Sequence, residues 1–260
     1  MHLTAENVQE LSARFESAPT VDILRWAWET FGSRVAIGTS FQGAGLVMIH
    51  LARQAKIPLP VFTLDTGLLF PETLELKKRI ESFFRISIEM LVPALTVEEQ
   101  GRRHGPELWK RDPDECCTLR KVEPLQKKLQ TLDCWIAGLR RQQSEERATI
   151  GIVELYEFDT IHSREIVKLN PMAQWKRKEV WDYLRNHRIP YNPLHDRGYR
   201  SIGCVPCTQK AGGENERAGR WIGFNKTECG IHAFMKKKGG LSARRGEEGR
   251  GGARKGEEGM

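Results

Sequence analysis

The stretch RVAIGTS, residues 34–40, is a short apolar run that ends in small and hydroxyl side chains, as a buried β-strand does. A turn with two glycines follows it, and a helical run then ends before Pro58. The stretch LPVFTLD, residues 59–65, predicts a second strand, and a helix with proline at its first position follows over residues 71–84. Strands that alternate with helices in this way predict a parallel sheet.

The same pattern continues outward from these two units. Residues 85–91 and 134–139 predict two further strands, and a strand pair is predicted to end in the segment IVKLNPM. Helices are predicted in the first 32 residues and from about residue 176 to residue 188. The fold class is therefore α/β: a parallel, twisted sheet with helices on both faces, whose ligands bind at the carboxyl ends of the strands.

We expect one domain over residues 1–235. Between the third and fourth predicted strands lies a long helical insertion, and residues 191–233 are rich in Gly, Pro, Cys and Arg. Loop and turn chemistry of that kind predicts a mobile C-terminal arm, at about residues 208–235, that carries function. Residues 236–260 form a separate tail.

Composition excludes several classes of protein. The chain has 260 residues, of which 39% are hydrophobic and 29% charged, enough to bury a core. No apolar run approaches the roughly 20 residues that span a bilayer, so we expect no membrane-embedded segment. The start, MHLTAENVQE, is polar and does not resemble a secretory signal, so we expect a cytoplasmic protein.

The formal net charge of +7 is unevenly distributed. Residues 236–260 contain eight of the 41 Lys and Arg residues, four of the 34 acidic residues and eight of the 24 glycines. The preceding chain is therefore only mildly basic, and a tail with so few apolar groups is expected to be disordered. A solvated appendage is favoured over an RNA-binding segment, and nucleic acid is not an expected partner.

Six cysteines occur, and four of them form two close pairs. Cys204 and Cys207 form a C-x-x-C motif, whose spacing lets two thiolates reach one metal centre from a tight turn. Cys116 and Cys117 are adjacent, so chelation of a single zinc ion by both would be strained. Four thiolates match the ligand number of a [4Fe–4S] cluster, and a structural Cys₄ zinc site is the alternative. Cys134 lies in an apolar strand and is interpreted as a small buried side chain.

The sixth cysteine, Cys229, stands apart from these pairs in the segment NKTECGIH, residues 225–232. An exposed cysteine near Lys226 and His232 can have a lowered thiol pKa and act as a nucleophile. The alternative is a free surface cysteine, and residue chemistry alone does not decide between the two.

Residues after the first strand predict an anion-binding site. A strand that ends in Ser40, followed by Gly43, offers backbone N–H groups and a hydroxyl to an anion at a helix N-terminus, with a plain tight turn as the alternative. The loop matches neither GxxxxGK[ST] nor GxGxxG. If the cysteines share a cluster, several cations converge near Cys229, as a multiply charged substrate requires. These cations come from the set Arg120, Lys121, Arg140, Arg141, Arg147, Arg217 and Arg220.

Five motifs occur in a characteristic order: TLDTGLLFPET, CCTLRKVEPL, GLRRQQS, GCVPCT and KTECGIH. Together they resemble the phosphoadenylyl-sulfate reductase family over about residues 20–233, and the CC…C-x-x-C set is similar to the iron–sulfur adenylyl-sulfate (APS) reductases. The resemblance implies an adenine-nucleotide α-hydrolase-like fold, related to PP-loop ATP pyrophosphatases. It also implies a two-step reaction: the Cys229 thiolate attacks the sulfur of APS and AMP leaves, and thioredoxin or a similar dithiol then releases sulfite from the enzyme S-sulfocysteine.

The resemblance also implies site residues. It implies one [4Fe–4S] cluster on Cys116, Cys117, Cys204 and Cys207. The nucleotide is expected near Ser40 and Gly43 of a modified PP-loop and near Asp65, Thr66 and Gly67 of the LDTG turn. The phosphosulfate is expected near Lys121, Arg147, Arg217, Arg220 and His232, with Arg140 added for its place after the fourth strand. The first loop, SFQGAGLV, departs from the SGAED-like loop of many relatives.

Other functions remain open from the sequence. A reductase of the same fold that prefers the 3′-phosphorylated substrate, PAPS, is the nearest alternative. A PP-loop thiolation ligase would need ATP and usually an SGGxDS loop, which this sequence lacks. A zinc-stabilised nucleic-acid-binding protein is the non-enzymatic alternative. A homo-oligomer is possible on this sequence.

Overall fold

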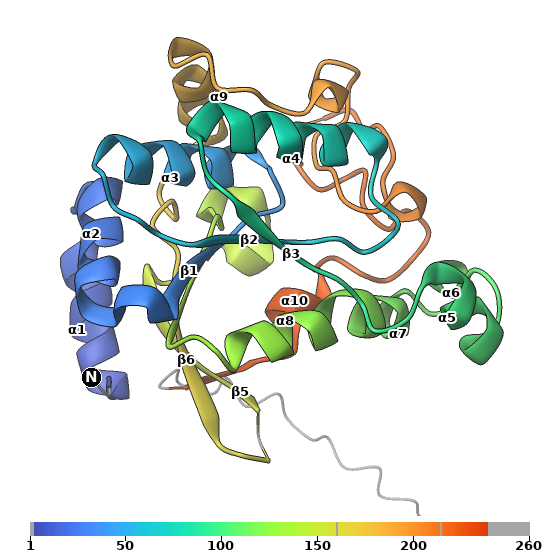
Figure 1. Cartoon of the computed structure of the whole chain (residues 1–260), viewed down its shortest axis with the longest axis horizontal. Helices are drawn as coiled ribbons and strands as arrows, with labels where there is room; N and C mark the ends of the chain where they lie inside the picture. Colours follow the sequence, from blue (N-terminus) through green and yellow to red (C-terminus); the bar gives the residue numbers. More distant parts are fainter. Residues whose placement is uncertain (1–2, 160, 214, 239–260) are drawn as a thin grey trace, which may run out of the picture.

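The computed structural model describes residues 3–159, 161–213 and 215–238, and those residues contain a seven-stranded sheet (Figure 1). The strands follow the order β3-β2-β1-β4-β6-β5-β7. The first five of these are parallel, while β5 pairs antiparallel with β6 and β7 pairs antiparallel with β5. Their bounds are β1 Val35–Gly38, β2 Val61–Leu64, β3 Ile88–Leu91, β4 Cys134–Ala137, β5 Val153–Asp159, β6 Arg164–Leu169 and β7 Lys236–Lys238.

Both faces of the sheet are buried because its central strands carry apolar side chains at every position. On β1, Val35 and Ile37 belong to one hydrophobic core, and Ala36 belongs to a second core on the opposite face. Figure 1 shows α3, α4 and α9 on one side of the sheet and α8 on the other. The bounds of the helices around the sheet are α1 Ala5–Phe15, α2 Thr20–Phe31, α3 Gly43–Gln54, α4 Pro71–Phe84, α8 Glu123–Leu129 and α9 Arg177–Asn186.

The predicted fold class is confirmed, and the helix predicted over residues 71–84 has those bounds as α4. Pro71 starts it, where the missing N–H costs nothing. The strand pair predicted to end in IVKLNPM is the antiparallel hairpin β5–β6, which makes one edge of the otherwise parallel sheet antiparallel. None of the helices in the described part of the chain is long and apolar enough to cross a membrane.

The insertion between β3 and β4 is a series of short helices. These are α5 Val97–His104, α6 Leu108–Arg111 and α7 Pro113–Cys117. A π-helical turn, Thr118–Val122, then joins α7 to α8. Such turns widen a helix locally and often occur at functional sites. This one turns both Arg120 and Lys121 into the protein, where they are buried.

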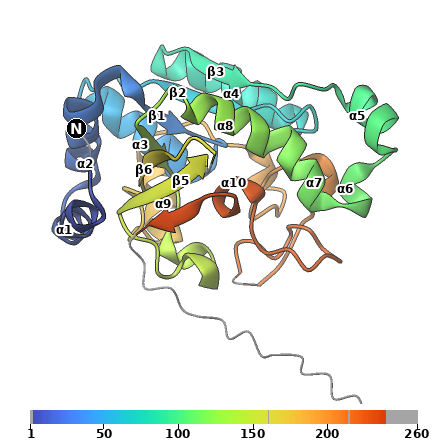
Figure 2. The same ribbon diagram turned by 90° about the horizontal axis from the view of Figure 1, so that it is seen from below.

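The C-terminal arm passes along the sheet and ends as part of it. Figure 2 shows the arm running from α10, Gly230–Ala233, to β7 beside β5. Residues 236–238 were predicted to belong to a disordered tail, and that boundary was wrong. Lys237 and Lys238 form ion pairs with Glu154 and Glu165, so a strand of three lysines is stabilised at the sheet edge. The rest of the predicted tail, residues 239–260, lies outside the described residues.

Candidate active site

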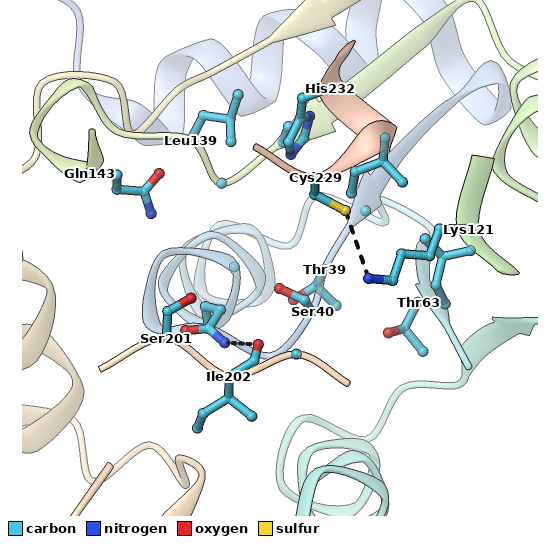
Figure 3. Close-up of a pocket in the computed structure, with 18 of the residues that line it drawn as sticks. Thr39, Ser40, Thr63, Lys121, Leu139, Gln143, Ser201, Ile202, Cys229 and His232 are labelled. Atoms are coloured by element: carbon cyan, nitrogen blue, oxygen red, sulfur yellow. Dashed lines mark hydrogen bonds between the residues drawn. The ribbon is translucent and has the colours of Figure 1, made fainter. Parts of the chain in front are cut away.

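A cavity opens at the carboxyl ends of β1, β2 and β4, and the C-terminal arm covers it. It encloses about 1220 Å³, including solvent at its mouth. Figure 3 shows hydroxyl side chains on one side of this space and Cys229 with His232 on the other. Ten of the residues lining it are Ser40, Thr63, Thr66, Lys121, Trp135, Arg147, Arg217, Arg220, Cys229 and His232.

The loop after β1 forms one wall of the cavity. The Thr39 hydroxyl accepts a hydrogen bond from the Phe41 N–H at 3.0 Å, and Gln42 Nε2 donates to the Ile202 carbonyl at 2.7 Å. Gly45 allows this close turn, because a Cβ atom there would lie 2.4 Å from Thr39 Oγ1. The exposed Ser40 therefore lies just before the N-terminus of α3, a helix of 12 residues whose terminal N–H groups favour anions.

Gly43, the other predicted residue of this loop, does not line the cavity. A Cβ atom at Gly43 would lie 2.6 Å from Val180 and 3.2 Å from Leu184 of α9. Glycine is therefore required here by helix packing, because α3 and α9 approach each other closely at this point. The helix α3 also begins at Gly43, so the predicted turn with two glycines is part of this helix.

The LDTG turn follows β2 and contacts the loop that carries Cys204 and Cys207, called the cysteine loop below. Asp65 Oδ1 accepts a hydrogen bond from the Gly67 N–H at 2.8 Å, which closes the turn. Gly67 has φ +68°, a left-handed conformation that suits glycine. Thr66 lines the cavity, and its hydroxyl lies 3.2 Å from Cys204 Sγ. Asp65 and Gly67 do not line it, so only Thr66 of the three predicted residues reaches this space.

The four paired cysteines converge on one region. Burial raises the pKa of Cys116 and of Cys207, and the charge of Cys204 raises both further, so these three thiols are close enough to interact. Cys117 instead forms a hydrogen bond with Cys229. In the described ranges no three His, Cys, Asp or Glu side chains are arranged as ligands of a metal ion. Cys134 is fully buried in β4, away from this region, as predicted.

Lys121 lies among these sulfur atoms. Its Nζ is 3.8 Å from Cys117 Sγ and 3.8 Å from Cys229 Sγ, and the residue is 8% exposed. Burial lowers the pKa of this lysine, but electrostatic interaction with the sulfur atoms of Cys204, Cys229 and Cys117 outweighs it and raises that pKa. A buried ammonium whose polar neighbours are sulfur atoms indicates a region that accommodates anionic sulfur. The four thiols therefore fit an iron–sulfur cluster in number and in chemistry.

Cys229 immediately precedes α10 and points toward Lys121 (Figure 3). The expectation of an exposed thiol beside Lys226 was wrong: Cys229 is half-buried, and Lys226 forms an ion pair with Asp114. A hydrogen bond from Cys117 lowers the pKa of Cys229, and Lys121 lowers it further, against the effect of burial. A thiolate at this position is accordingly stabilised.

Glu228 fixes the arm beside the cavity. Its two carboxylate oxygens accept from Arg147 Nε and Nη2, each at 2.7 Å, and Oε1 also accepts from Arg217 at 2.9 Å. The same oxygen accepts from the Cys229 N–H at 2.7 Å. Sequence reasoning missed this residue, although an acid directly before the cysteine in KTECGIH is a usable signal. Glu228 joins two predicted cations to the predicted nucleophile.

Of the two remaining arginines that were expected near the phosphosulfate, one lines the cavity and the other does not. Arg220 lines the cavity and donates to the Cys207 carbonyl at 3.2 Å, so it links the arm to the cysteine loop. Arg140 does not line this cavity; it forms a buried ion pair with Glu216 at 2.6 Å. The structure thus brings Arg147, Arg217 and Arg220 together at the cavity, whereas Arg140 is not part of its lining.

His232 lies in the cavity against two residues that sequence reasoning also missed. Its ring stacks on Trp135 with centroids 5.5 Å apart and planes at 10°. Lys168 Nζ lies 3.4 Å from His232 Nδ1. Burial and the charges of Lys168, Arg147 and Arg217 lower the pKa of His232, so its imidazole is neutral near pH 7. The signal for Lys168 was available, because a lysine interrupts the apolar strand in IVKLNPM.

Solved structures share this architecture. The phosphoadenylyl-sulfate (PAPS) reductase from Candida auris in its phosphate complex has a TM-score of 0.69 and 27% identity, and the match covers 79% of this chain and 98% of that one. An FMN adenylyltransferase from Candida glabrata, in complex with FAD and inorganic pyrophosphate, has a TM-score of 0.54 and 11% identity, over 79% of this chain and 66% of that one. The second likeness concerns the fold alone, which is the predicted nucleotide-binding α/β class.

The sequence comparison identifies the family. Residues 34–210 match the phosphoadenosine phosphosulfate reductase domain, and the chain belongs to this family. It is 44% identical over 225 residues to the adenosine 5′-phosphosulfate reductase of Salinibacter ruber, and the match covers 85% of this chain and 87% of that protein. It is also 44% identical to adenosine 5′-phosphosulfate reductase 2 of Bacillus subtilis, over 82% of this chain and 89% of that protein. The resemblance found from the five motifs is confirmed.

Proposed function

We propose that this protein is an oxidoreductase of sulfate assimilation that reduces adenosine 5′-phosphosulfate to sulfite and AMP, with Cys229 as its nucleophile. The observation that carries the proposal is the position of the Cys229 thiol, 3.8 Å from Lys121 Nζ at the wall of a cavity that four arginines also line. The relatives at 44% identity are named for this activity.

The first step transfers the sulfonate group to Cys229. The thiolate attacks the sulfur of the phosphosulfate, an S–S bond forms, and the S–O bond to the AMP phosphate breaks. AMP leaves with the electron pair of that bond, so the products are an enzyme S-sulfocysteine and AMP. AMP is a good leaving group, and the protein therefore supplies mainly a stabilised thiolate and compensation of charge.

The two sides of the cavity suit the two ends of this substrate. Ser40 and the N-terminus of α3, with Thr66, receive the nucleotide portion on the side that carries the hydroxyl groups. Lys121, Arg147, Arg217 and Arg220 lie on the charged side and neutralise the phosphosulfate. Because the charged side includes the arm, substrate binding and closure of the arm over the thiol occur together.

The second step needs a dithiol reductant, and thioredoxin or a similar cytoplasmic protein supplies it. One thiolate of the dithiol attacks Cys229 Sγ, and sulfite leaves with the electron pair. The second thiol then displaces Cys229 as a thiolate, and the dithiol becomes a disulfide. The half-buried Cys229 requires the arm to move outward for this step.

We further propose that Cys116, Cys117, Cys204 and Cys207 hold one [4Fe–4S] cluster. As a ligand, Cys117 would no longer donate to Cys229, and Lys121 would then be the group that stabilises the Cys229 thiolate. When bound, the cluster ties α7 to the C-x-x-C loop and supplies negative charge beside Lys121. Iron and acid-labile sulfide after anaerobic purification test this proposal. About four irons for each chain is the expected result, and a zinc protein without iron would contradict it.

The substrate is proposed to be APS instead of PAPS, because the APS reductases share 44% identity and the solved PAPS reductase shares 27%. Sulfite release from the two nucleotides under identical conditions tests this preference. A clear preference for PAPS would overturn the choice of substrate and leave the chemistry of Cys229 intact.

The nucleophile is tested by Cys229→Ser. We expect this variant to bind AMP, keep its cluster and lose sulfite production by at least about 1000-fold, because the covalent intermediate cannot form. Mass spectrometry of the parent protein after incubation with APS and no reductant should show a sulfonate on Cys229. Cys134→Ala, a buried cysteine away from the cavity, serves as the matched control and should keep its activity. A Cys229→Ser variant that produces sulfite at the parental rate would refute the role.

A further inference from the structure

A second buried lysine, Lys168, contacts His232 and does not line the cavity described above. It is the second-last residue of β6 and is 2% exposed, which makes it one of the largest fully buried side chains of the described residues. Burial of an ammonium group lowers the free energy of unfolding, so a buried lysine at this position needs an explanation. Among the described residues, the hydrogen-bond contact of its Nζ is His232 Nδ1, at 3.4 Å.

The surroundings hold this lysine in one place. Its Nζ lies 5.2 Å from the centroid of the Trp135 ring and 4.9 Å from that of Tyr156. Glu154 faces it across the β5–β6 register, but the carboxylate of Glu154 is bonded to Lys237, Asn170 and the Tyr156 hydroxyl. Two aromatic faces therefore flank the ammonium and hold it in place, and the ammonium donates to the imidazole.

We propose that Lys168 is a positioning residue: it donates a hydrogen bond to Nδ1 of His232, fixes the ring in the tautomer with its proton on Nε2, and so prepares that N–H to donate to an oxygen of the phosphosulfate. The stacking on Trp135 sets the plane of the ring, and Lys168 sets which nitrogen carries the proton. The role of the Nε2–H toward the substrate rests on the proposed function, whereas the tautomer itself does not.

Other charged groups around Lys168 are compatible with this arrangement. Burial lowers the pKa of Lys168 to about 8, with Glu154 acting against burial and Arg147 adding to it. Glu228, which precedes α10, also favours the ammonium, and Lys237 on β7 disfavours it. The lysine is therefore an ammonium near pH 7 and loses its proton at mildly alkaline pH. The neutral amine can accept a hydrogen bond from Nδ1–H, so deprotonation removes the constraint on the tautomer.

The tautomer is tested directly by ¹⁵N NMR of the full-length protein labelled at its seven histidines, with His232→Gln to assign the signal. In the parent protein at pH 7 we expect His232 to be neutral with the proton on Nε2, and to change toward a mixture of tautomers as the pH rises through about 8. Lys168→Met should show the mixture at every pH. Lys168→Gln, whose amide can still donate to Nδ1, should keep the Nε2–H form without the alkaline change.

The rate of sulfonate transfer from APS gives the second readout. For the parent, kcat/KM should fall above about pH 8 as Lys168 loses its proton. Lys168→Met should lower kcat/KM roughly 10-fold at pH 7 by removing one positioned hydrogen bond, and Lys168→Gln should recover most of that loss. Neither variant should keep the alkaline fall.

A parental His232 with its proton on Nδ1, or a Lys168→Met variant with the parental tautomer and pH profile, would overturn the inference. If the variants do not fold, the pH dependence of the parental ¹⁵N signal still decides, because an unchanged tautomer from pH 7 to pH 9 would contradict it. A parent protein that shows the expected tautomer and does not reduce APS would contradict the proposed function and leave the positioning role of Lys168 standing.

Discussion

The two ends of the parallel strands use charge differently. At the amino ends of β1 and β4, Arg34 and Asp133 form a bidentate pair with distances of 2.6 and 2.7 Å, and both side chains are 48% exposed. At the carboxyl ends, Lys121 and Lys168 are buried and neither forms an ion pair with a carboxylate in the described ranges. The ion pair at the amino ends is exposed to water, and its two charges neutralise each other. The two lysines at the carboxyl ends are buried and have no carboxylate partner among the described residues.

This difference shows where charge serves stability and where it serves chemistry. An exposed pair contributes little to folding, because water and salt already stabilise each partner. A buried ammonium without a carboxylate destabilises the folded chain unless another group compensates it. In this protein the compensating groups are the sulfur atoms of Cys117 and Cys229 for Lys121, and an imidazole with two aromatic rings for Lys168. The carboxyl end therefore has positive charge available for an anionic substrate.

The largest effect that would sharpen the contrast is expected for Lys121→Met. Removal of this ammonium leaves the Cys229 thiolate and the phosphosulfate without their nearest cation, so sulfonate transfer should slow about 100-fold or more. Single-turnover formation of the S-sulfocysteine measures it. Lys127→Met, an exposed lysine on α8, is the matched control and should change the rate less than twofold. If the Lys121→Met variant transferred sulfonate at a rate within threefold of the parent, the proposed difference between the two ends of the strands would be wrong.

An intermediate effect is expected for Glu228→Gln. The variant leaves Arg147 and Arg217 without their shared carboxylate and weakens the hold on the Cys229 N–H. We expect kcat/KM to fall about 10-fold and thermal stability to fall as well, because removal of one partner leaves buried charges uncompensated. Glu145→Gln, an exposed acid from the same region, should alter neither. Parental activity together with parental stability would show that Glu228 does not position the arm.

The smallest effect belongs to the amino end. Arg34→Gln should lower the free energy of unfolding by less than about 1 kcal/mol and leave sulfite production unchanged. The hydrogen bond from Arg34 lowers the pKa of Asp133, so the pair stabilises the fold above the pKa of an unfolded aspartate. This contribution disappears as the pH falls through the lowered pKa, and the two proteins should then unfold alike. Urea unfolding at pH 7 and at low pH measures the difference, and a large loss of activity would break the contrast.

Much of the fold could be predicted because its signals are local. The apolar run after Arg34, the proline at residue 71 and the alternation of strands with helices predict four of the five parallel strands and the helices that cover them. The strand β7 could not be predicted, because three lysines have no intrinsic reason to form a strand. They do so through Glu154 and Glu165, which lie far away in the sequence.

The site was predicted less evenly, and the particular residues explain why. Cys229 and the paired cysteines are distinguished by residue type and spacing, so they could be named as candidate site residues from the sequence. Gly43 was assigned to an anion site, and the structure shows it packed against α9. Glu228, Trp135 and Lys168 were missed, because each is ordinary in type and distinguished only by what it contacts.

The sequence by itself determined the α/β sheet and the family and indicated Cys229 as a candidate nucleophile, since periodicity and rare residue types are visible along a single chain. Tertiary structure alone decided which cation faces that thiol and which nitrogen of His232 faces Lys168. The physical reason is that electrostatic interactions depend on distance and burial. Both quantities arise only when segments more than a hundred positions apart, such as Lys121 and Cys229, are packed together.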